Sequence, residues 1–84
     1  MEETTIYIEM FDEAVRVFVP IPSLHLGDRY YKVLKHNRAD YEALRFEAGT
    51  YVLCLPTKLL GSDNLVPLAY CEVSKKEAEY ASLV

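Results

Sequence analysis

Two cysteines, Cys54 and Cys71, and two histidines, His25 and His36, are the side chains best suited to metal binding. The cysteines lie too far apart for a CxxC metal or redox motif. A zinc site needs further ligands, and the spacing of the histidines does not supply them. We therefore expect no metal and no other cofactor.

His25 is the candidate general base, because Asp28 lies where it could orient the imidazole ring. However, no serine or cysteine is placed as a nucleophile, and a histidine between two leucines more often packs or bonds a main-chain carbonyl. The sequence has three glycines, so it offers no phosphate-binding loop or dinucleotide fingerprint. We predict that the protein is not an enzyme.

A basic segment, residues 29–38, is the strongest candidate for partner binding. It holds four cations and no acidic residue, whereas residues 1–13 hold five acidic residues and no basic one. Tyrosines among the cations offer flat faces for stacking and cationic contacts. The candidate partner-binding residues are Tyr30, Lys32, Lys35, Arg38 and Tyr41.

The alternative is that this segment has no binding role. A charged strand and loop are often simply solvated, and tyrosines suit half-buried strand surfaces. The net charge of −4 disfavours nucleic acid, so a protein partner is preferred. We expect a non-catalytic protein-binding module, such as an accessory or immunity-type partner of a neighbouring gene product. The alternative is a small barrel that binds RNA or another single-stranded nucleic acid. A homodimer formed through an edge strand is a further alternative.

The chain has 84 residues, of which 51% are hydrophobic, so we expect one small globular domain spanning residues 1–84. No apolar run approaches the length of a membrane span. The acidic start, Met1–Thr5, lacks the features of a signal peptide. The expected compartment is the cytoplasm.

Alternation of apolar residues predicts a hairpin near the start of the chain. A turn centred on Asp12–Glu13 pairs Met10 with Val15, Ile8 with Val17 and Ile6 with Val19, all on one face. Pro20 and Pro22 are expected to end the second strand. An extended connection then leads to a turn at Gly27–Asp28.

A third strand is predicted over residues 29–35, with Tyr31 and Val33 on one face. A polar loop and one helical turn at 41–43 should follow. Residues 44–46 and 50–55 are predicted to form a hairpin, with Gly49 at the position of its turn where φ is positive. Phe46 joins Val17, Val33 and Val52 in the expected core.

A fifth strand is predicted over residues 65–73, after a loop with its tip at 61–64. That hairpin would place Cys54 opposite Cys71 as two free, largely buried thiols. Ser74 and Glu77 have the spacing of a capping box, which predicts a helix over about 75–83. Tyr80 and Ala81 are expected to pack on the barrel.

Five short strands in a meander predict a mainly β fold: a small five-stranded SH3-like barrel, or a strongly bent antiparallel sheet, with a short C-terminal helix. An OB-like barrel is the competitor. It usually carries a helix between its third and fourth strands, where this sequence offers only the turn at 41–43.

Residues 18–54 resemble an uncharacterised family of small bacterial SH3-like barrel proteins. The pattern is aromatic-x-Pro-Val, His-Leu-Gly, Tyr-x-Val and Trp-x-Phe-x-Pro-Gly-x-x-Val-x-Cys. Val19, Leu44 and Ala48 depart from it, because the family has arginine, tryptophan and proline there. The resemblance implies the barrel fold more than an activity. The matching residues are Phe18, Pro20, Ile21, His25, Leu26, Gly27, Tyr31, Val33, Asp40, Glu42, Phe46, Gly49, Val52 and Cys54.

Overall fold

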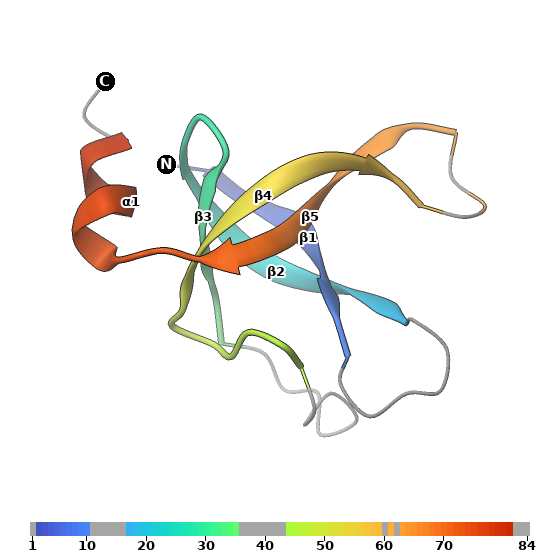
Figure 1. Ribbon diagram of the computed structural model, residues 1–84, viewed down its shortest axis with the longest axis horizontal. Coiled ribbons are helices and arrows are strands. Elements are labelled where there is room, and N and C mark those ends of the chain that lie inside the picture. Colours follow the sequence, from blue (N-terminus) through green and yellow to red (C-terminus); the bar gives the residue numbers. More distant parts are fainter. Residues whose placement is uncertain (1, 11–16, 36–43, 60, 62, 82–84) are drawn as a thin grey trace.

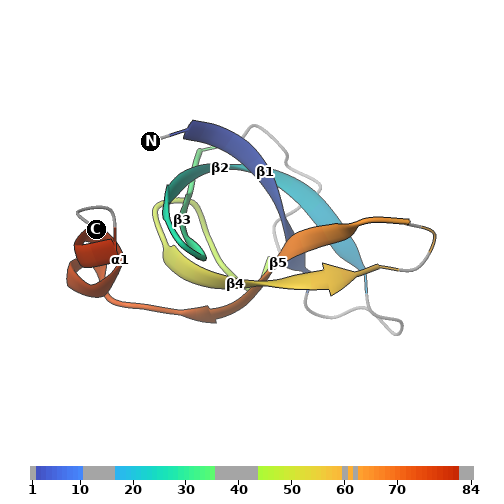
Figure 2. The same ribbon diagram turned by 90° about the horizontal axis from the view of Figure 1, so that it is seen from above.

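The computed structural model describes residues 2–10, 17–35, 44–59, 61 and 63–81. They form a closed barrel of five strands in the order β1-β2-β3-β4-β5, followed by one short helix (Figures 1 and 2). The predicted fold class, a small five-stranded barrel with a C-terminal helix, is confirmed. The elements are β1 (Glu2–Glu9), β2 (Phe18–Gly27), β3 (Tyr30–Val33), β4 (Tyr51–Lys58), β5 (Leu65–Glu72) and α1 (Lys75–Ala81).

The first hairpin is present, but its register differs from the prediction by two residues. Ile6 pairs with Ile21 and Ile8 with Val19 across β1 and β2. Because side chains alternate with period two, a shift of two residues keeps the same side chains on the inner face. The apolar face was therefore predicted correctly and the pairing was not.

Pro20 and Pro22 do not end β2, contrary to the prediction. The Leu34 amide donates to the Pro22 carbonyl at 3.0 Å, so the backbone groups of Pro22 point away from β1. Pro20, two residues earlier, points the same way. Neither ring therefore removes a hydrogen bond from the β1–β2 ladder, and the strand continues to Gly27.

The predicted turn at Gly27–Asp28 links β2 to β3, and Asp28 adopts a positive φ of 46°. In β3 the side chains alternate as predicted: Val33 is buried and Tyr31 packs against the core. The predicted polar loop and helical turn over residues 36–43 lie outside the described residues.

Residues 44–50 form a turn as predicted, but not a hairpin. The Thr50 amide donates to the Glu47 carbonyl at 3.1 Å, and Gly49 between them has φ of 92°. A glycine with positive φ at this position is typical of a type II turn. Leu44, however, bridges Met10 rather than β4. β4 pairs instead with β3 and β5.

β4 and β5 form a long hairpin whose register is shifted by a bulge. Leu53 pairs with Cys71, whereas Cys54 pairs with Ala69, so Tyr70 is the extra residue. The predicted pairing of Cys54 with Cys71 is therefore wrong. Both thiols are free, but only Cys54 is buried, and Cys71 is half-exposed. Beyond the barrel the hairpin continues as a projecting arm (Figure 2).

The barrel closes between β1 and β5 through one parallel pair, Tyr7 with Leu68. We call this junction the seam. The amides and carbonyls of Thr5 and Tyr7 point toward β5, because the Met10 amide donates to the Val17 carbonyl on the β2 side and main-chain groups alternate along the strand. Continuing the parallel ladder toward Thr5 needs an amide donor from position 67, and Pro67 has none. Pro67 thus ends the ladder, and the arm diverges from β1 (Figure 1).

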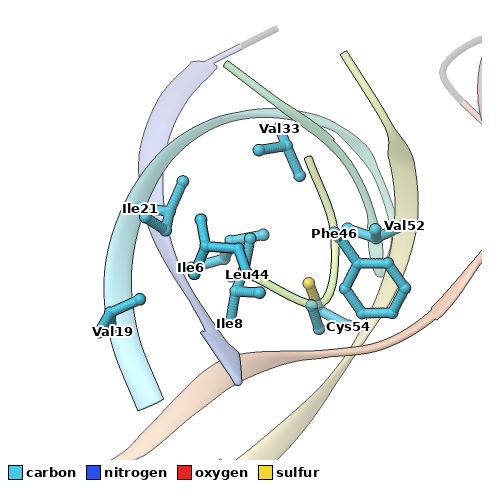
Figure 3. Packing of buried hydrophobic residues seen from close by; sticks show 10 residues of the cluster. Ile6, Ile8, Val19, Ile21, Val33, Leu44, Phe46, Val52 and Cys54 are labelled. Atoms are coloured by element: carbon cyan, nitrogen blue, oxygen red, sulfur yellow. The ribbon is translucent and has the colours of Figure 1, made fainter. Parts of the chain in front are cut away.

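The core fills the barrel with side chains from every strand and from the 44–46 segment (Figure 3). Val33, Phe46 and Val52 are buried as predicted. Val17 is only partly buried, because the shifted register places it opposite Met10 at one end of the barrel. The buried apolar residues of the cluster are Ile6, Ile8, Val19, Ile21, Val33, Leu44, Phe46, Val52, Cys54 and Ala69.

Helix α1 begins after Ser74, whose Oγ accepts a hydrogen bond from the Glu77 amide at 3.1 Å. This confirms the Ser74 half of the predicted capping box. In place of the reciprocal bond, the Glu77 carboxylate accepts a hydrogen bond from Tyr30. Ala78 is fully buried against the barrel, and Ala81 is half-buried. Tyr80 does not pack on the barrel as predicted, since 71% of it is exposed. Within the described residues, none of the helical structure has the length and apolar character that a membrane crossing requires.

Candidate partner-binding surface

Two of the five predicted binding residues, Tyr30 and Lys32, lie on the outer face of β3. Their neighbours Tyr31 and Val33 face the core, so alternation directs Tyr30 and Lys32 outward. Lys35 is exposed just beyond the strand. The other two predicted residues, Arg38 and Tyr41, lie outside the described part of the chain.

Tyr30 links the barrel to the helix. Its hydroxyl donates a hydrogen bond of 2.8 Å to Oε2 of Glu77, so this carboxylate turns toward β3 rather than back to Ser74. The hydrogen bond to Glu77 raises the pKa of Tyr30, because ionisation would put two negative oxygens in contact. Tyr30 thus holds α1 against the outer face of the barrel.

A groove of about 440 Å³ lies where α1 meets β3. Tyr30 and Tyr80 line it together with Lys76, whose aliphatic stem adds apolar surface. Sequence reasoning missed Tyr80, which it assigned to the packed face of the helix. The spacing of Ala78 and Ala81, three residues apart, was the available signal, because it defines a buried face that excludes position 80.

Lys32 and Lys35 border a second hollow, of about 470 Å³, beside the turn at Ala48–Gly49. The Lys32 Nζ lies 5.6 Å from the ring centroid of Tyr51, its partner across β3 and β4. This cation–π contact orients the ammonium group over the sheet. The outer face of β3 therefore presents aromatic and cationic groups side by side.

A third hollow, of about 250 Å³, opens at the base of the arm between Arg29, Tyr31 and the strand ends of β4 and β5. Cys54 lies at its inner wall, and burial raises the pKa of this thiol to about 12. At neutral pH the thiol is therefore protonated and a poor nucleophile.

His25 is engaged by its neighbours. Its Nε2 lies 2.7 Å from the Asp28 main-chain carbonyl, and its ring stacks on Tyr31 at 4.7 Å between centroids. A carbonyl only accepts, so Nε2 carries the proton. The base-and-carboxylate arrangement considered from sequence is replaced by a bond to the main chain.

No group of three or more histidine, cysteine, aspartate or glutamate side chains gathers in metal-binding geometry within the part of the chain that the structure describes. Comparison of the chain with protein-family models, with curated proteins and with solved structures found no match.

Proposed function

We propose that this barrel is a non-catalytic, cytoplasmic protein-binding module, an accessory or immunity-type partner of a neighbouring gene product. Its binding surface comprises the outer face of β3, the groove beside α1 and the remainder of the basic segment after β3. The candidate residues are Tyr30, Lys32, Lys35, Arg38 and Tyr41, to which we add Tyr80. Membership of the bacterial family that residues 18–54 resemble is part of the same proposal.

The exposed ring of Tyr80 beside Tyr30 is the observation that carries the proposal. A tyrosine that is 71% exposed and lines a groove with a second tyrosine offers a large apolar area with two hydroxyl groups. Tyrosine loses little conformational freedom on binding, which is why it is enriched in protein interfaces. The groove is thus suited to a side chain or short segment of another protein.

Charge adds a preference for an acidic partner. Lys32 and Lys35 border one hollow and Lys76 the neighbouring groove, while the Glu77 carboxylate is engaged by Tyr30. Charges at the rim of an interface chiefly raise the association rate and are screened by salt. Binding should therefore weaken as ionic strength rises.

The test uses the purified products of the genes adjacent to this one and measures their binding by biolayer interferometry. Lys32→Glu/Lys35→Glu and Tyr80→Ala should each weaken binding by about tenfold or more, equivalent to about 1.4 kcal/mol. Lys58→Glu and Tyr70→Ala are the matched controls, because both residues are exposed on the β4–β5 hairpin. Equal loss in the controls, or none in the test variants, would refute the proposed surface.

Binding of a single-stranded nucleic acid is the second candidate, supported by the cation–π pair of Lys32 and Tyr51. A titration with fluorescently labelled oligouridine at about 50 mM salt tests it. Saturable, salt-sensitive binding that Lys32→Glu/Lys35→Glu abolishes would favour this function over a protein partner. No binding under these conditions would eliminate it.

A further inference from the structure

The first half of β1 has an open backbone edge. The Met10 amide donates to the Val17 carbonyl at 2.9 Å, and main-chain groups alternate in direction along a strand, so the even-numbered residues of β1 are the ones whose amides and carbonyls face β2. The amides and carbonyls of Glu3 and Thr5 therefore point to the opposite side. There the pairing with β5 consists of Tyr7 with Leu68 alone. Glu2–Thr5 are all exposed in their side chains as well. Such an edge is a template for one more strand.

Prolines lie where other ladders of the described barrel end. Pro20 and Pro22 direct their ring nitrogens past the end of β3, as the hydrogen bond from Leu34 shows. The Cys54 amide donates to the Arg29 carbonyl on the β3 side, so Pro56, two residues on, faces past the start of β3. Pro67, opposite Pro56, faces away from β4.

All four prolines of the chain thus lie where a ladder with a neighbouring strand ends, at positions that offer no amide donor to a further strand. Proline at such positions prevents pairing with another strand. Glu3 and Thr5 are an exception, since both keep the donor and the acceptor that strand addition needs. The arm also leaves this edge accessible, because it diverges from the first half of β1 (Figure 1).

We propose that residues 3–5 of β1 accept an extended, basic segment of another protein by strand addition. Exposed Glu2 and Glu3 on this edge select lysine or arginine in the added strand. A second copy of this chain is disfavoured, because self-pairing would gather the glutamates of both copies on one short edge. This site lies apart from the β3 surface and does not depend on the function proposed above.

The test uses two synthetic hexapeptide probes of alternating sequence, one of lysine and valine and one of glutamate and valine. Fluorescence anisotropy should show binding of the lysine peptide alone. Thr5→Pro should weaken it by about tenfold or more, because the ring removes the donor and blocks approach. Thr5→Val is the control and should retain binding, since it keeps the amide. In NMR spectra, the Glu3 and Thr5 amides should shift when the lysine peptide is added.

Thr5→Pro should fold, because the amide at position 5 points away from β2, as at Pro20 and Pro22. If it does not, the charge variant Glu2→Lys/Glu3→Lys decides instead: it should reverse the preference toward the glutamate peptide. Equal binding by folded Thr5→Pro and wild type, or equal binding of both peptides, would overturn the proposal. So would a concentration-dependent dimer in sedimentation that Thr5→Pro abolishes, because the occupant would then be a second copy. Lys32→Glu/Lys35→Glu should leave peptide binding unchanged.

Discussion

Phe46 contributes an aromatic side chain to a core otherwise built from aliphatic and small residues. It lies outside the five strands, yet only 7% of it is exposed, with Arg45 over its ring at 5.1 Å. We predict that Phe46→Ala lowers the free energy of unfolding by about 3–5 kcal/mol, because it removes a large buried ring and leaves a cavity. Small domains have about 5–15 kcal/mol in total, so the loss is severe.

Urea unfolding followed by circular dichroism measures this change. Tyr80→Ala is the matched aromatic control and should shift the free energy by no more than about 0.5 kcal/mol, since its ring is exposed. A Phe46→Ala variant with the same unfolding midpoint as the control would show that Phe46 does not belong to the core.

The two cysteines should differ in reactivity. Cys71 is half-exposed, whereas Cys54 is 1% exposed. When the folded protein is titrated with a thiol reagent, Cys71 should therefore react faster and Cys54 very slowly. The denatured protein, without added reductant, should show two reactive thiols per chain. If the denatured, unreduced protein shows no reactive thiol, the two cysteines form a disulfide.

The raised pKa of Cys54 also predicts a pH dependence of stability. Burial raises this pKa to about 12 from an ordinary value of 9.0, so the thiol is protonated in both states below pH 9. Between pH 9 and 12 the unfolded state loses the proton while the folded state keeps it, which favours unfolding. The stability advantage of wild type over Cys54→Ala should narrow across this range in urea titrations. If the difference in unfolding free energy between wild type and Cys54→Ala stays constant across this range, the pKa of Cys54 is not raised by burial.

Among the secondary structure elements, α1 depends most on its cap, because it has only seven residues. Ser74→Ala removes the hydrogen bond to the Glu77 amide and should cost about 1 kcal/mol, with faster hydrogen exchange along α1. Ser74→Asp keeps an acceptor at this position and should restore both quantities. Equal exchange in Ser74→Ala and wild type would show that docking through Ala78 and Tyr30 suffices.

The strands were predictable as segments but not as pairs. Alternation identifies an inner face, and it is satisfied equally by two registers that differ by two residues, which is why Ile6 was assigned to Val19 rather than Ile21. The prolines were misread for a related reason. Whether a proline ends a strand depends on which neighbour its nitrogen faces, and that neighbour is set by the sheet.

At the scale of the whole molecule, the arm extends beyond the core. The cluster of buried residues includes Cys54 of β4 and Ala69 of β5 but none of the described residues from Leu55 to Leu68. Thr57 and Val66 form a hydrogen-bonded pair, since the adjacent Pro56 and Pro67 face away from each other. Replacing residues 58–65 by Asn-Gly should therefore close a two-residue hairpin.

This shortened barrel should unfold cooperatively, with a free energy within about 1 kcal/mol of wild type, because none of the described residues that are removed is buried. Circular dichroism and urea unfolding are the measurements. Loss of the cooperative transition would show that the arm takes part in the core.

The candidate site was only partly predictable from the sequence. Tyr30 and Lys32 were identified from the composition of one strand, and alternation places both on its outer face. Tyr80 was missed and the Tyr30–Glu77 contact was not foreseen, because the partners lie 47 residues apart and meet only when α1 docks on β3.

Local patterns in the sequence by themselves determined that this chain forms short strands with one apolar face, a glycine turn at 47–50 and a capped final helix. These features depend on the alternation of side chains, on backbone sterics and on hydrogen bonds over three or four residues. Only the tertiary structure decided the register of the strand pairs, the bulge at Tyr70, the seam and the open edge of β1. Each depends on which strand lies alongside, and closing the barrel around a shared core selects that neighbour.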